Sequence, residues 1–145
     1  MAPTIFELPE CFTNTTLLFE AQERKDPFVE QTYIICPNTV MNIGDFDQNF
    51  DCCVDGDFSL FVRSRSIIQC GEDGSSANNC TLVGGNTQMF SLGSIYSDVF
   101  STGMIVRGLT FQSADFTSVS LLQQGDITFE DCIFKVRELT RNSLR

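Results

Sequence analysis

TGMIVRGLTFQS (residues 102–113) and GDITFEDCIFKV (residues 125–136) share one apolar pattern at an offset of about 23 residues. Four pairs of apolar residues coincide at this offset: Met104 with Ile127, Val106 with Phe129, Leu109 with Cys132, and Phe111 with Phe134. The residues between them do not, since Glu130 stands where Arg107 was and Asp131 where Gly108 was. Apolar positions that recur while polar positions change indicate a repeated core unit with variable exposed residues.

TLVGG at residues 81–85 lies one more such offset before Met104 and aligns Val83 with Val106, which suggests a third, weaker copy. A period of this length with short strands, turns and no helix in the repeat predicts a β-solenoid whose successive coils pair in parallel. Leucine-rich repeats have a similar period, but their Leu-x-x-Leu-x-Leu signature is missing. The fold class predicted is therefore all-β, a short right-handed parallel β-helix with coils of about 23 residues.

Length and composition place the chain among globular domains. Its 145 residues suit one domain, and an apolar content of 42% with fourteen Phe and no Trp favours stacked strands over a helical bundle. The net charge of −10 makes nucleic acid and bare membrane poor partners, and no stretch is long and apolar enough to span a bilayer. Residues 135–145 carry a net +3, which leaves −13 for residues 1–134.

One helix is predicted, over TTLLFEAQERK at residues 15–25, capped by Thr15 or Thr16 and with an apolar face that includes Leu17 and Leu18. Three regions follow from this prediction. Residues 1–30 form an N-terminal segment with a capping helix, and residues 31–136 form the coils. Residues 137–145 are a polar, basic tail or the truncated start of the next coil.

Seven cysteines without a single His make zinc improbable and predict a disulfide framework. Cys70 and Cys80 bracket the loop GEDGSSANN, which a disulfide would close. Cys132 occupies a repeated apolar position and is expected to be the odd thiol, buried and inert. The other four cysteines have no assigned pairing, although the simplest scheme joins the adjacent pair to the two upstream residues: Cys11, Cys36, Cys52 and Cys53.

The expected location follows from the cysteines and two glycosylation triplets. Disulfides predict a secreted, extracellular or otherwise oxidising compartment. Asn14-Thr15-Thr16 and Asn79-Cys80-Thr81 are acceptor triplets for N-linked glycans. The start MAPTIFELPE lacks the cationic and apolar regions of a signal peptide, which predicts a mature chain or a fragment with a new initiator Met.

Three segments in order resemble a known family, the right-handed parallel β-helix proteins of the pectate lyase type. They are RSRSIIQCGEDG (63–74), TGMIVRGLTF (102–111) and DITFEDCIF (126–134). The chain also resembles uncharacterised secreted β-helix proteins of diatom-type algae, a resemblance that implies a fold and no activity. The family implies an N-terminal helix over the first coil, which Leu17, Leu18 and Phe19 would provide by covering an open sheet edge.

The lyases of this family abstract a proton with a basic residue beside bound calcium and acidic ligands, and the resemblance matches three residues of this chain to the family's motifs. Glu130 takes the place of the family's Asp, Asp131 that of its His, and Arg107 that of a strand Arg. The missing His also removes the His-containing motifs of the related hydrolases. The alternative interpretation is that all three are exposed on the outside of the coils, with Arg107 and Glu130 forming a surface ion pair one coil apart.

A second candidate site is acidic. DFDQNFDCCVDGD (45–57) places oxygen ligands at alternate positions, as calcium loops do, and the candidates are Asp45, Asp47, Asn49 and Asp51. Phe50 and Gly56 stand where an EF-hand needs Gly and Glu, so the alternative is a solvated acidic loop. Calcium is the one cofactor that the sequence suggests.

Three functions follow. The leading hypothesis is a secreted, non-catalytic structural or binding β-helix module that contacts extracellular polysaccharide. The alternative is a fragment of a polysaccharide lyase or glycoside hydrolase. The third is a subunit of an assembly, joined to another protein through the open C-terminal coil near Ile133.

Overall fold

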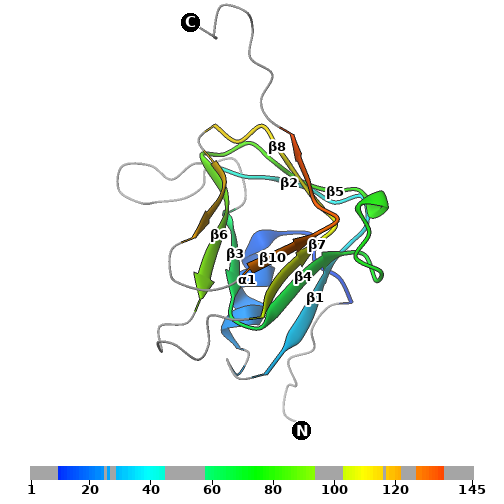
Figure 1. Ribbon diagram of the computed structural model, residues 1–145, viewed down its shortest axis with the longest axis vertical. Helices are drawn as coiled ribbons and strands as arrows, with labels where there is room; N and C mark the ends of the chain where they lie inside the picture. The colour runs from blue at the N-terminus through cyan, green and yellow to red at the C-terminus, as the bar shows by residue number, and fades with distance from the viewer. Residues whose placement is uncertain are drawn as a thin grey trace, which may run out of the picture.

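The computed structural model describes residues 10–24, 26, 29–44, 58–93, 103–115, 117–121 and 127–135. Over these residues the chain is mostly β, with three parallel sheets and one α-helix, so the all-β class is confirmed (Figure 1). A 3-10 turn lies between β4 and β5, at Ser76–Asn78. The elements are α1 Thr15–Glu23, β1 Gln31–Ile35, β2 Val40–Asn42, β3 Leu60–Arg63, β4 Ser66–Cys70, β5 Cys80–Val83, β6 Thr87–Gly93, β7 Met104–Arg107, β8 Leu109–Gln112, β9 Thr117–Leu121, β10 Ile127–Glu130 and β11 Ile133–Lys135.

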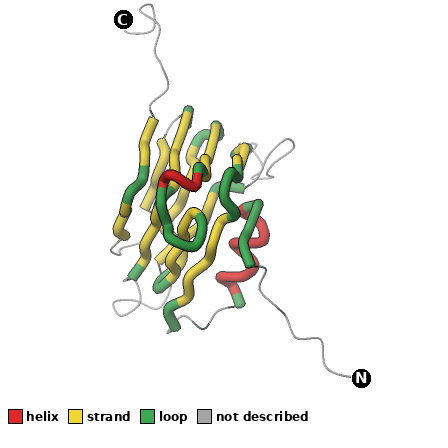
Figure 2. The backbone as a smooth tube through the Cα atoms, turned by 90° about the vertical axis from the view of Figure 1, so that its right-hand side faces the viewer, coloured by secondary structure: helices red, strands yellow, loops and turns green. Residues whose placement is uncertain are grey.

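Each sheet takes every third strand of the chain. The first sheet has the order β1-β4-β7-β10, the second β2-β5-β8-β11 and the third β3-β6-β9. Every pair within them is parallel. In the described part, the chain therefore visits the three sheets in turn, adding one strand to each on the first three passes and one to each of the first two sheets on the fourth. Figure 2 shows the strands side by side, with α1 at one end of the row and the last strands at the other.

The apolar repeat of residues 102–113 and 125–136 is confirmed for the last two passes. Met104 of β7 pairs with Ile127 of β10, and Phe111 of β8 pairs with Phe134 of β11. The Phe111 and Phe134 rings stack with their centroids 4.8 Å apart. Side chains on the same face of neighbouring strands stabilise a sheet. The apolar residues that align in the sequence are therefore the residues that pair in the sheets.

The weaker third copy was wrong. Val83 pairs with Gln112 of β8, and the residue beside Val106 is Ile68 of β4. Gln69 and Arg107, which are partners in the same two strands, are 38 residues apart in the sequence. Loops between the strands are longer in this earlier pass, so the short period describes the last pass only.

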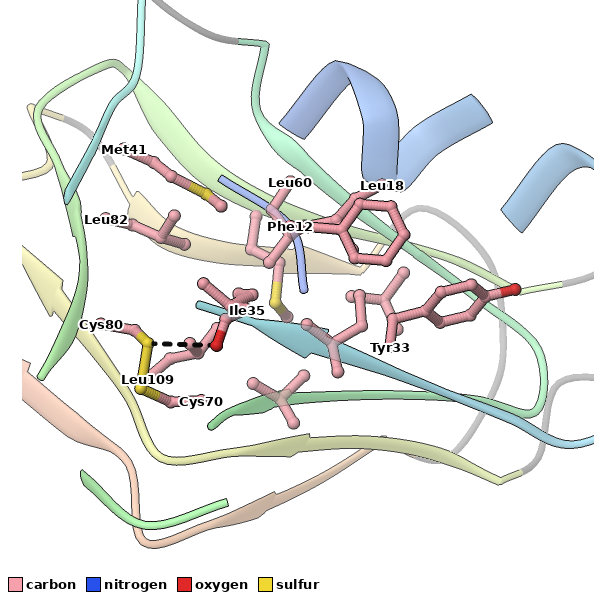
Figure 3. Packing of buried hydrophobic residues seen from close by; sticks show 14 of the residues in the cluster. Phe12, Leu18, Tyr33, Ile35, Met41, Leu60, Cys70, Cys80, Leu82 and Leu109 are labelled. Carbon is pink, nitrogen blue, oxygen red and sulfur yellow. Dashed lines mark hydrogen bonds between the residues drawn. A yellow bond between two sulfur atoms is a disulfide. The ribbon is translucent and has the colours of Figure 1, made fainter. Parts of the chain in front are cut away.

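The core lies between the three sheets and is made of the inward-facing residues of the strands (Figure 3). In the second sheet these are Met41, Leu82 and Phe111, with exposed fractions of 1%, 1% and 0%. The next residue of the same row, Phe134, is 50% exposed. Burial is therefore complete through the third pass and incomplete at the fourth.

The end of the first sheet nearest the N-terminus is covered by a short extended segment. Phe12 N–H donates to the Ile34 carbonyl at 2.7 Å, and Cys36 N–H donates to the Phe12 carbonyl at 2.9 Å. Phe12 itself is buried, and its ring meets that of Tyr33 edge-on. The outer edge of β1 is thus hydrogen-bonded to the backbone of Phe12, so it is not available at this point to pair with another strand.

Helix α1 covers the third sheet in the same way. The Gln22 side chain behaves like a neighbouring peptide group: its Nε2 donates to the Phe61 carbonyl at 2.7 Å, and its Oε1 accepts from Arg63 N–H at 2.8 Å. Leu18 is fully buried, and the centroid of the Phe19 ring lies 5.5 Å from that of Phe61. The predicted cover over the first pass is therefore present.

Two details of the predicted helix were wrong. The N-cap is Asn14, whose Oδ1 accepts from Leu17 N–H at 2.9 Å, rather than Thr15 or Thr16. Thr15 is instead buried, and its hydroxyl donates to the Phe58 carbonyl at 2.7 Å. The Leu17 side chain is 44% exposed and does not cover the core, because the buried face turns toward β3 through Leu18.

Candidate functional site

Three polar side chains lie side by side on the outer face of the first sheet. Gln69, Arg107 and Glu130 occupy equivalent positions of β4, β7 and β10. We call this row the polar ladder. Arg107 Nε donates to Glu130 Oε2 at 2.6 Å, and its NH1 donates to Gln69 Oε1 at 3.3 Å. The ion pair expected between Arg107 and Glu130 is therefore confirmed.

The ion pair contributes little to stability. The Arg107 and Glu130 side chains are 33% and 48% exposed, so solvent screens their attraction. Pairs of this kind contribute about 1 kcal/mol at most. Their effect is to hold the two side chains in fixed positions over the sheet, with the guanidinium also held by Gln69.

A loop of residues 71–79 leaves the sheets beside the polar ladder. Gln69 pairs with Arg107, and Cys80 pairs with Leu109. Ten residues therefore separate Gln69 from Cys80 in this pass, whereas Gly108 alone separates Arg107 from Leu109 in the next pass. Gln69 anchors the start of the loop, since its Nε2 donates to the carbonyls of Gly71 and Glu72 at 3.1 and 2.7 Å. Gln69 is buried although it lies on the outer face. Sequence reasoning missed this residue, because no local pattern shows that one side chain positions both the loop and Arg107.

Asp73 organises the tip of the loop. Its Oδ1 accepts from Ser75 N–H at 3.1 Å and from the Asn78 side chain at 2.5 Å. These two hydrogen bonds, the first the larger, hold the pKa of the Asp73 carboxyl below its ordinary value. Asn78 also donates to the Cys70 carbonyl at 3.0 Å, which ties the tip to the base of the loop.

Asp131 joins this loop to the last pass. Its Oδ2 accepts from Ser76 N–H at 2.8 Å, a contact across 55 residues of sequence. Asp131 has a φ of 50° and Gly108, at the equivalent repeat position, a φ of 74°. The turn between the first and second sheets therefore needs left-handed backbone at this position, which Gly adopts freely and Asp tolerates.

Glycine is required at position 108 for two reasons: the loop backbone packs closely against it, and its backbone angle φ is positive. A Cβ on Gly108 would lie 2.6 Å from the Gly74 carbonyl oxygen, and a Cβ on Gly74 would lie 3.1 Å from the Arg107 side chain. The loop thus rests directly on β7. Nothing in the sequence around Gly108 distinguished this packing glycine from an ordinary turn glycine.

The chemistry available at the ladder is hydrogen bonding. Arg107 is engaged by Glu130 and Gln69, and Asp131 by the loop, so each residue at a lyase-like position is held by contacts within the protein. The interior hollow beside Cys80 and Leu82 has no space for a water molecule.

Two disulfides are present among the described residues. Cys70 and Cys80 are joined, with their Cα atoms 5.7 Å apart, which confirms the predicted closure of the loop. Cys11 and Cys36 are joined to each other, with Cα atoms 4.9 Å apart. The simplest pairing from sequence, in which these two bond to Cys52 and Cys53, was therefore wrong, because the Phe12 segment pairs with β1 and brings Cys11 beside Cys36.

Cys132 carries a free thiol that is only partly buried, whereas full burial was expected. It belongs to the last pass, which has no further described strand over it. Burial raises the pKa of the Cys132 thiol, and the sulfur contacts the Val106 carbonyl at 3.4 Å. A thiol whose pKa is raised by burial is a poor nucleophile.

The calcium candidates Asp45, Asp47, Asn49 and Asp51 lie outside the described residues, as do Cys52 and Cys53. In the described part of the chain, no three His, Cys, Asp or Glu residues gather in a group that could hold a metal ion. The two disulfides are typical of proteins from oxidising compartments.

The two glycosylation triplets differ in setting. Asn79 is exposed, follows the 3-10 turn with a φ of 64° and precedes β5 directly. Asn14 is partly buried and uses its Oδ1 to cap α1. A glycan would attach at Nδ2 in both, which leaves the capping oxygen of Asn14 in place.

Comparison of the chain with protein-family models, with curated proteins and with solved structures found no significant match. Among the described residues, no helix has the length and apolar character needed to cross a membrane.

Proposed function

We propose that the three sheets are the walls of a short right-handed parallel β-helix, as in the pectate lyase-type family that the sequence resembles. One strand added to each sheet per pass, always in parallel, supports this architecture. Crossovers between parallel strands are almost always right-handed, which supports the handedness. On this scaffold the chain acts as a secreted, non-catalytic structural or binding module that contacts extracellular polysaccharide.

The observation that carries the non-catalytic part is the polar ladder. Arg107 and Glu130 of the ladder, and Asp131 beside it, which the resemblance matches to residues of the family's motifs, are each engaged in a contact within the protein. A ladder of fixed hydrogen-bonding groups along successive strands suits an extended polymer, whose hydroxyls repeat along its length. The net charge of −10 disfavours anionic polymers, so the ligand class we propose is a neutral polysaccharide.

A binding assay with two matched variants tests the proposal. Arg107→Ala removes the centre of the ladder, and Arg63→Ala removes a similar exposed arginine whose NH2 pairs with Glu23 at 2.7 Å. On a glycan array and in a pull-down from isolated cell wall, Arg107→Ala should lower the signal at least about tenfold. Arg63→Ala should leave it unchanged. A wild-type protein that binds nothing in either assay contradicts the binding function.

A lyase or hydrolase fragment is the second candidate. It is favoured by one observation: the three segments that resemble the family contribute β4, β7 and β10, which are neighbours in the first sheet. The test is the release of unsaturated or reducing-sugar products from acidic polysaccharides. Product that disappears in Glu130→Gln supports the enzyme, and no product from the wild type argues against it.

A further inference from the structure

The acceptor triplet Asn79-Cys80-Thr81 lies where the loop of residues 71–79 enters β5. Asn79 is exposed, and its φ of 64° places it in the left-handed region. The next residue, Cys80, is 1% exposed and forms the disulfide with Cys70 that closes the loop. The middle residue of the triplet is therefore both a core residue and one half of a covalent crosslink.

The backbone around the triplet is hydrogen-bonded on both sides of Cys80. Thr81 N–H donates to the Thr39 carbonyl at 2.9 Å, and Asn79 N–H donates to the Ser76 carbonyl at 3.1 Å. β5 lies between β2 and β8 in the second sheet and pairs with both. The folded protein thus holds the triplet inside a sheet, and releasing it means separating β5 from the strands on either side.

N-glycosylation requires the acceptor triplet to enter the active site of the enzyme that attaches the glycan. There, Asn79 Nδ2 bonds to the first sugar of a lipid-linked oligosaccharide diphosphate, the bond between that sugar and the diphosphate breaks, and Nδ2 loses one proton. A triplet fixed inside a sheet cannot enter another active site, so attachment has to precede the pairing of β5. Because Asn79 is exposed, a glycan already attached there extends into solvent and is compatible with the fold.

We propose that N-glycosylation of Asn79 competes with formation of the Cys70–Cys80 disulfide, so that the timing of this disulfide decides which chains carry the glycan. Closure takes two protons and two electrons from the two thiols and passes them to an oxidised dithiol carrier of the same compartment. It fixes Cys80, the middle residue of the triplet, against Cys70. The proposal rests on the secreted part of the proposed function and not on carbohydrate binding.

The two reactions fall in the same period. The two cysteines are ten residues apart in the sequence. Chains grow at about 5–20 residues per second, so this stretch is made in about 0.5–2 s. Disulfides form over seconds or longer, so closure and glycan attachment overlap in time. We therefore expect the wild type to be a mixture of chains with and without a glycan at Asn79.

The second acceptor triplet, Asn14-Thr15-Thr16, is a control within the same chain. It contains no cysteine, and the Cys11–Cys36 disulfide lies outside it. A change that stops Cys70 from bonding should therefore raise attachment at Asn79 and leave attachment at Asn14 as it is in the wild type.

Expression behind a cleavable secretion leader, in cells that attach N-glycans, tests the proposal. Occupancy is read by mass spectrometry after an amidase has converted each glycosylated Asn to Asp. All newly made chains are analysed, so a variant that fails to fold still gives a result. Cys70→Ser keeps the triplet intact and should raise Asn79 occupancy at least about twofold. The matched control, Cys11→Ser, removes the other disulfide and should leave Asn79 occupancy unchanged.

A second measurement tests whether the glycan and the fold are compatible. Secreted wild-type chains that carry the glycan at Asn79 should also contain the Cys70–Cys80 disulfide, because attachment comes first and closure follows. Glycosylated chains in which both thiols stay free would contradict this order of events.

Three further results would overturn the proposal. One is complete occupancy at Asn79 in the wild type, since no competition would then exist. Another is equal occupancy in Cys70→Ser and the wild type. The third is an equal rise in Cys11→Ser, which would mean that slow folding of the whole chain, and not closure of the loop, controls attachment. The glycan array and cell-wall assays need no attached glycan, so failure of the binding function and failure of this competition can be told apart.

Discussion

Replacing Phe111 and Phe134 in turn compares the contribution to stability of a fully buried position with that of the equivalent half-exposed position in the last pass. They occupy equivalent positions of β8 and β11 and stack with centroids 4.8 Å apart, but Phe111 is 0% and Phe134 50% exposed. Replacing a fully buried Phe by Ala removes its transfer free energy and leaves a cavity, at a cost of about 3–5 kcal/mol. At Phe134 half of the surface is already in water and the space left is open to solvent. Phe134→Ala should therefore cost about 1–2 kcal/mol.

The assay is urea unfolding followed by far-ultraviolet circular dichroism under non-reducing conditions, with linear extrapolation to water. It should be run at a protein concentration low enough that the chain is monomeric. Equal losses of stability for Phe111→Ala and Phe134→Ala, or a larger loss for Phe134→Ala, would refute the description of the last pass as unfinished core.

Three further outcomes follow from single contacts. Gln22→Leu leaves two backbone groups at the edge of β3 without partners and should cost about 1–3 kcal/mol in thermal unfolding, whereas a loss near zero would mean that water replaces the amide. The pKa of Asp73 is lowered in the folded protein, so the stability that its carboxylate contributes is present above the unfolded pKa and is lost as the pH falls through the folded pKa. Asn78→Ala removes one of the hydrogen bonds to this carboxylate and should raise the Asp73 pKa measured in an NMR titration. An unchanged pKa would contradict the hydrogen bond. Gly108→Ala forces a Cβ to 2.6 Å from a loop carbonyl at a φ of +74° and should lower stability by about 1–3 kcal/mol, measured as a lower urea midpoint; an unchanged midpoint would show that the loop can lift away.

The apolar residues that repeat in the core could be predicted from the sequence. Met104 with Ile127 and Phe111 with Phe134 could be aligned by eye, because each inward position of a strand must be apolar and the pass between them is short. The same logic failed one pass earlier, where Val83 was placed beside Val106. A period cannot be read where loops of unequal length separate the strands, since burial constrains the strands and leaves the loops free to vary.

The part of the site that depends only on the pairing register of the strands could be predicted from the sequence. Arg107 and Glu130 had to be neighbours once β7 and β10 were aligned, and they form the expected pair. The role of Asp131 could not be inferred, because its partner Ser76 lies 55 residues away in a loop of irregular backbone. Gln22 was likewise missed, since a glutamine that imitates a strand has no local signature.

The loop of residues 71–79 is attached to the sheets at two points that lie close together. It enters and leaves the sheets through Cys70 and Cys80, whose Cα atoms lie 5.7 Å apart, so the scaffold sees only a narrow neck closed by a covalent bond. The neighbouring pass completes the same turn with Gly108 alone, which shows that the strands need none of the loop's length to hold their register. A change of loop length between the two cysteines is therefore confined by the disulfide at the neck, and it reaches the sheet only through the contacts of the loop with Gln69, Gly108 and Asp131.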